Sequence, residues 1–127
     1  MEDEKKFDLE ERLITFAVEI SVLVEAVPNT LSGKYISGQL IRSGLSPALN
    51  YGEAKSAESS NDFIHKMKIA LKELRESFIA LKILNRSKTQ EKNILLEKCI
   101  MECNELISIF VKSIQTAERN RKTKESR

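Results

Sequence analysis

Residues 62–84 read DFIHKMKIALKELRESFIALKIL and carry the clearest helical pattern in the chain. Apolar side chains recur there at steps of three and four residues, which places them on one face of an α-helix. The members of this face are Phe63, Met67, Ala70, Leu71, Leu74, Phe78, Leu81 and Leu84. The stretch therefore predicts a long helix whose seam faces a hydrophobic core.

Three further segments show the same periodicity, over about residues 8–27, 31–57 and 89–118. Short connections between helices make consecutive helices antiparallel neighbours. We therefore predict an all-α fold, an antiparallel up-and-down four-helix bundle over residues 1–118. The second segment contains Gly44 and Pro47. Because proline lacks the amide that bonds one turn back, we predict a kink near Pro47 or a break at residues 43–46.

The chain has 127 residues, 41% of them hydrophobic and 31% charged, which fits one globular domain. Its uncharged apolar runs, such as residues 20–24, are far too short to span a membrane. No apolar segment follows the charged N-terminus, so no secretory signal is predicted. We expect a cytoplasmic protein that makes no membrane contact.

Positive charge gathers at the end of the chain, although the net charge is only +2. Residues 119–127 hold five basic side chains against one acidic one, and we predict a basic, flexible tail there. Such a tail either keeps the chain in solution or attracts phosphates.

The sequence lacks the groups that an enzyme active site needs. His65 is the only histidine, which excludes a catalytic triad and a histidine-rich metal site within one chain. Cys99 and Cys103 fall within the apolar face of the last helix, where thiols act as small hydrophobic groups. No glycine-rich phosphate loop occurs. We expect no enzymatic activity, no metal and no cofactor.

Polar residues at helical spacing predict a network between the second and third helices. Its predicted members are Arg42, Asn50, Glu53, Glu73 and Glu76. Residues of this kind set the register of packed helices when each charge has a partner, and we favour that role over catalysis.

Two helices are apolar on more than one side, which predicts contacts between chains. The residues expected in an oligomer interface are Ile14, Val18, Val22, Ile69 and Ile83. Exposed aliphatic seams of this length would otherwise reduce solubility.

A basic strip follows one edge of the third helix. It consists of Lys68, Lys72, Arg75, Lys82 and Arg86. Such a strip is either a solvated face or a nucleic-acid surface. Glutamates of the first helix outnumber its single arginine and can neutralise the strip across an interface, so the position of the strip relative to that helix decides between the two.

The segment QLIRSG at residues 39–44, then Ser46, NYGEA at residues 50–54, and Asp62 and Phe63 resemble a bacterial four-helix-bundle family. That family is encoded by intervening sequences in 23S ribosomal RNA genes. The resemblance implies a kinked second helix, a ring-shaped homopentamer and no established biochemical activity. It also implies distant relatives whose basic surfaces bind nucleic acid.

These observations predict a non-enzymatic, oligomeric binding protein. Its expected partners are further copies of itself and RNA or DNA, contacted through the phosphate backbone without base reading. The alternative is a structural or protein-interaction scaffold that binds no nucleic acid.

Overall fold

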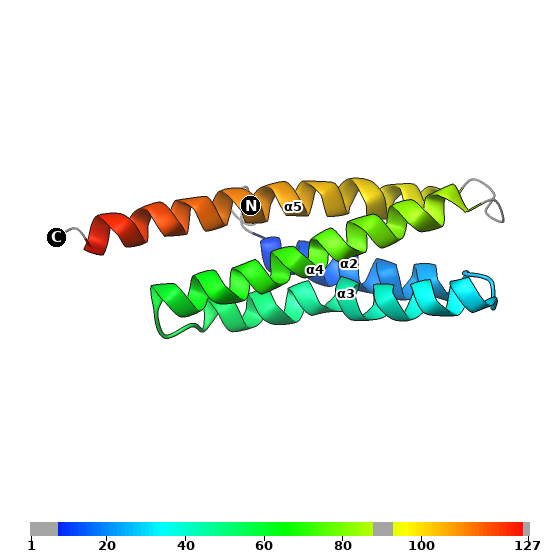
Figure 1. Cartoon of the computed structure of the whole chain (residues 1–127), viewed down its shortest axis with the longest axis horizontal. Helices are drawn as coiled ribbons and strands as arrows, with labels where there is room; N and C mark the ends of the chain where they lie inside the picture. Colours follow the sequence, from blue (N-terminus) through cyan, green and yellow to red (C-terminus); the bar gives the residue numbers. More distant parts are fainter. Residues whose placement is uncertain (1–7, 88–92, 126–127) are drawn as a thin grey trace.

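A computed structural model describes residues 8–87 and 93–125, and these ranges are helical apart from short connections. The helices are α2 (Leu9–Glu25), α3 (Leu31–Lys55), α4 (Ser60–Arg86) and α5 (Ile94–Glu125). Figure 1 shows consecutive helices running in opposite directions. The predicted up-and-down four-helix bundle is confirmed. None of the described helices is long and apolar enough to cross a membrane.

Polar side chains fix the beginning of every described helix. Each accepts a hydrogen bond, of 3.0 to 3.1 Å, from a backbone amide three residues further along the chain. The four capping residues are Asp8, Thr30, Ser59 and Asn93. Amides in the first turn have no acceptor within the helix, so these caps stabilise the four helix starts. The predicted start of the last helix, near residue 89, lies outside the described residues.

The core consists of one face from each helix. Phe16 of α2, Leu40 of α3, Leu74 of α4 and Phe110 of α5 are completely buried. The ring of Tyr51 meets that of Phe110 edge to face, with 6.0 Å between centroids. Apolar burial on this scale is the main stabilising contribution to a small bundle.

Helix α3 continues without interruption through Pro47, which is buried inside it. The predicted break at residues 43–46 is therefore wrong, while the kink near Pro47 stays a prediction. The helix packs against both α2 and α4, and this packing outweighs the loss of one backbone hydrogen bond. Gly44 brings α3 close to α2, because a Cβ at this position would lie 3.0 Å from Ile20 side-chain atoms.

Helix α5 is longer than the sequence predicts. The periodicity predicts an end near Glu118, whereas the helix continues to Glu125, so most of the predicted basic tail is helical. Arg121 donates a hydrogen bond of 3.0 Å to Asn61 at the start of α4. Figure 1 shows this end of α5 projecting beyond the connection between α3 and α4. Residues 126–127 lie outside the described part of the chain.

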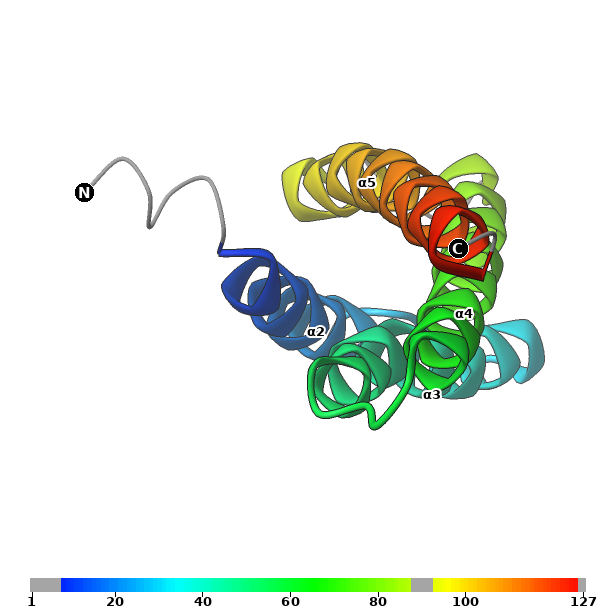
Figure 2. The same cartoon turned by 90° about the vertical axis from the view of Figure 1, so that its left-hand side faces the viewer.

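The four helices form an arc in which α2 and α5 are the two ends (Figure 2). These two helices pack less extensively than the consecutive pairs, and ion pairs join them. Arg12 donates hydrogen bonds of 2.9 and 2.7 Å to the two carboxylate oxygens of Glu102, and this contact raises the pKa of Arg12. Lys98 lies 2.7 Å from Glu19. A forked contact such as that between Arg12 and Glu102 fixes the orientation of α2 relative to α5.

Candidate assembly and binding surfaces

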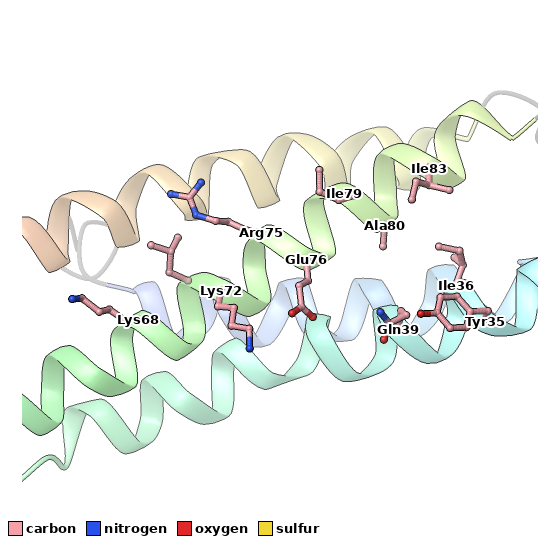
Figure 3. Close-up of a pocket in the computed structure, with 11 residues that line it drawn as sticks. Tyr35, Ile36, Gln39, Lys68, Lys72, Arg75, Glu76, Ile79, Ala80 and Ile83 are labelled. Carbon is pink, nitrogen blue, oxygen red and sulfur yellow. The ribbon is translucent and has the colours of Figure 1, made fainter.

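A groove of about 730 Å³ runs between α3 and α4 on the outside of the bundle (Figure 3). Lys68, Lys72 and Arg75 lie at one end of it, and Ile79 and Ile83 at the other. Tyr35 and Ile36 supply the wall from α3. An adjoining hollow of about 740 Å³ shares three of these residues and extends to Leu31. We call the two together the α3–α4 groove.

Large aliphatic side chains of the groove face solvent. Ile79 is 55% exposed and Ile83 is 56% exposed. Scattered apolar residues are normal on a protein surface, but a groove lined by several of them is typical of a binding site. The α3 side of this groove was not predicted, although Leu31 and Tyr35 are spaced four residues apart directly after the helix cap.

The basic strip lies on the solvent side of α4, and three of its five members line one end of the groove. Lys68 pairs with Glu118 of α5 at 3.0 Å, and this contact lowers the pKa of Glu118. The ammonium group of Lys82 lies 5.0 Å from the centre of the Phe78 ring. Three members are exposed without a side-chain hydrogen bond or ion pair to any described residue: Lys72, Arg75 and Arg86. Helix α2 packs on α3 and α5, so it does not neutralise the strip within one chain.

A second exposed apolar surface lies on α2. Ile14, Val18 and Val22 point outward, and the two valines are each 57% exposed. We call these three residues the α2 seam. Ile83 belongs instead to the α3–α4 groove, and Ile69 is half-buried on α4. The five predicted interface residues therefore do not form one continuous surface in a single chain.

The predicted polar network is wrong, because its members do not meet. Arg42 is exposed and donates to Gln39 on its own helix. Asn50 likewise bonds within α3, to the carbonyl and hydroxyl oxygens of Ser46. Glu53 forms a surface pair with Lys66 at 2.7 Å.

The two remaining members of the predicted network, Glu73 and Glu76, also lack the expected partners. Glu76 lines the groove, and one carboxylate oxygen of Glu73 is buried with no hydrogen-bond partner among the described residues. The buried polar contact between α3 and α4 is instead a 2.8 Å hydrogen bond from the Ser77 hydroxyl to that of Ser43. Because helical neighbours are about 100° apart, Ser43 faces α4 while Arg42 points to solvent.

Replacement of Arg42 by alanine is therefore expected to change the free energy of unfolding by less than about 0.5 kcal/mol, as for other exposed positions. In contrast, Ser77→Ala removes a buried donor and leaves the Ser43 hydroxyl unpaired, which costs about 1 to 3 kcal/mol. Urea unfolding followed by circular dichroism, at one fixed protein concentration, measures both changes. A decrease for Arg42→Ala that exceeds the decrease for Ser77→Ala would contradict this account.

The two cysteines lie in the core. Burial raises the pKa of Cys99 to about 11 and that of Cys103 to about 12. The thiol of Cys103 donates to the carbonyl oxygen of Leu74 at 3.2 Å. Buried thiols of this kind are inert. Within residues 8–87 and 93–125, no three histidine, cysteine or acidic side chains are placed to hold a metal ion.

The raised thiol pKa values predict a loss of stability in alkali. In the unfolded chain the thiols ionise near their ordinary pKa of 9.0, whereas the folded chain keeps their protons until about pH 11. Between these values the unfolded state releases protons that the native state retains, so stability falls as pH rises. Urea midpoints measured from pH 8 upward should fall more steeply for the wild type than for Cys99→Ala with Cys103→Ala. Equal slopes would contradict the prediction.

Comparisons with known proteins agree with this architecture. The family model described as 23S rRNA-intervening sequence protein matches residues 5–112. A crystal structure of a protein of unknown function, from the S23 ribosomal protein family of Bacteroides thetaiotaomicron, superposes with a TM-score of 0.74. The two chains are 31% identical, and the match covers 83% of this chain and 96% of that one. No curated protein matches. The chain therefore belongs to the family of 23S rRNA-intervening sequence proteins.

Proposed function

We propose that this protein is a non-enzymatic binding protein that acts as a homo-oligomer. The observation that supports this most strongly is the exposure of aliphatic side chains on two separate sides of one bundle, the α2 seam and the α3–α4 groove. Continuous apolar surfaces are rare on monomers and mark sites of protein association. The family resemblance suggests five copies arranged in a ring.

The assembly is tested by the molar mass of the wild type in solution. Light scattering after size-exclusion chromatography, at micromolar concentration, should give a multiple of the chain mass of 14.5 kDa. On dilution, the measured mass should decrease toward that of a single chain and no further. A mass of 14.5 kDa throughout would overturn the proposed function.

Nucleic-acid binding is a second candidate function, favoured by the open position of the basic strip. Lys72, Arg75 and Arg86 face solvent, and their charges are not paired with any described residue. Side chains of this kind contact phosphates and release counterions without reading bases. The apolar residues between them fit protein contact better, and for this reason assembly is the first candidate.

Fluorescence anisotropy with labelled duplex DNA and with RNA tests the second candidate. On DNA, the slope of log affinity against log salt should change by about 0.9 for each phosphate that a variant no longer neutralises. Lys72→Glu with Arg75→Glu should abolish binding, while Lys112→Glu on the exposed side of α5 should not. If the wild type binds neither DNA nor RNA at low salt, the nucleic-acid function is overturned. The protein is then a scaffold that binds no nucleic acid.

A further inference from the structure

Two helices present faces with the same residue spacing and opposite charge. The face of α2 reads Glu11, Ile14, Val18, Val22 and Glu25, at steps of three, four, four and three residues. The face of α4 reads Lys72, Arg75, Ile79, Ile83 and Arg86, at the same steps. The first is an apolar row that ends in acids, and the second is an apolar row that ends in bases.

Both rows are open surfaces. Steps of three and four residues keep each row within an arc of about 80° on its helix. All ten residues are at least partly exposed, and none of the charged side chains forms a hydrogen bond or ion pair within the described part of the chain. A monomer gives no physical reason for either row, because neither contributes to its core.

We propose that the α2 row of one copy packs along the α4 row of the next copy. This inference rests on the proposed function, since it names the partner surfaces of the oligomer. The spacing allows Val18 to fall opposite Ile79 whether the two helices run parallel or antiparallel. In both directions the acids at the two ends of the α2 row fall opposite bases.

The charges favour pairing of an α2 row with an α4 row over pairing of two identical rows. Two α2 rows packed together would place glutamates opposite glutamates, and two α4 rows would place bases opposite bases. Like charges at close range oppose association, whereas the mixed pairing brings opposite charges together. The contact is therefore heterologous, which is the kind that builds closed rings or open filaments.

The positions of the two rows allow each copy to use both at once. Figure 2 shows α2 and α4 on opposite sides of the arc of helices. Four of the five α4 residues line the α3–α4 groove, and Tyr35 and Ile36 provide its second wall. A helix that inserts an apolar row into such a groove follows a common mode of recognition, with side chains spaced three and four residues apart as anchors.

Variants that each disable one surface test the pairing. Val18→Glu should disable the α2 row and leave the α4 row intact, and Ile79→Glu should do the reverse. Both positions are exposed, so the circular dichroism spectrum should keep its helical form. Met101→Glu is the matched control, because Met101 is 72% exposed on α5, outside both rows. Sedimentation equilibrium is measured for each variant alone and for an equimolar mixture, at one total protein concentration at which the wild type assembles.

We expect Met101→Glu to assemble like the wild type, each row variant to be monomeric, and the mixture to form one-to-one dimers of twice 14.5 kDa. A mixture that stays monomeric would overturn the pairing, and so would a dimer formed by either row variant alone. These outcomes leave the proposed function standing as long as the wild type assembles. A monomeric wild type overturns the oligomer itself.

Discussion

An alanine at position 33 is expected to lower the free energy of unfolding by about 3 kcal/mol, at the upper end of the usual cost of overpacking. A Cβ on Gly33 would clash with the carbonyl oxygen of Pro28. Because this oxygen belongs to the backbone, the connection between α2 and α3 has to move. The movement also disturbs the helix cap, in which the Thr30 hydroxyl accepts a hydrogen bond of 3.0 Å from the backbone amide of Gly33.

Gly38, five residues further along the same helix, is the matched control. A Cβ at Gly38 meets no atom within 4 Å, so alanine adds only helix propensity there. We expect Gly38→Ala to raise the free energy of unfolding by up to about 1 kcal/mol. Urea unfolding of the two variants and the wild type, at one protein concentration, gives the comparison. If Gly33→Ala were as stable as Gly38→Ala, the close contact at the start of α3 would be wrong.

Reversal of the charges on α4 is expected to convert the assembly into monomers. With Lys72, Arg75 and Arg86 changed to glutamate, the α4 row of one copy meets the acids of α2 in the next copy, and like charges oppose the contact. Changing Glu11 and Glu25 to lysine in the same chain restores opposite charges across the interface. We call this five-substitution variant the doubly reversed chain. The doubly reversed chain should therefore assemble again, with a molar mass equal to that of the wild type in light scattering.

The doubly reversed chain also separates the two candidate functions. It regains the interface but no longer carries these bases on α4, so any nucleic-acid binding through the strip should disappear while assembly returns. Anisotropy and light scattering on the same sample provide both readouts. A doubly reversed chain that stays monomeric would show that the charges of the two rows do not face one another.

Periodicity in the sequence predicts the helices well, because steps of three and four residues follow directly from helix geometry. The orientation of each helix about its axis is harder to predict. In α4 most of the row that begins at Phe63 is buried as predicted, but Phe63 itself is only partly buried, and the neighbouring Ile64 is buried. Near the middle of α3, Ser43 lies against α4, whereas the neighbouring Arg42 is exposed.

The candidate surfaces were predicted only in part for a related reason. The α2 seam and the basic strip each lie on one helix, so one segment of sequence contains all the residues needed. The groove needs Tyr35 and Ile36 from α3 together with Ile79 and Ile83 from α4. Residues more than 40 positions apart come together only through packing of the helices, which no single periodic pattern specifies.

Cysteine cross-linking shows directly whether Val18 of one copy lies opposite Ile79 of another. The native thiols are buried with raised pKa values, so engineered surface cysteines should react alone. Val18→Cys chains and Ile79→Cys chains are oxidised separately and as a mixture, then separated without reductant. We expect cross-linked dimers in the mixture and almost none in either chain alone. Dimers of Val18→Cys with itself, or no cross-link in the mixture, would contradict it.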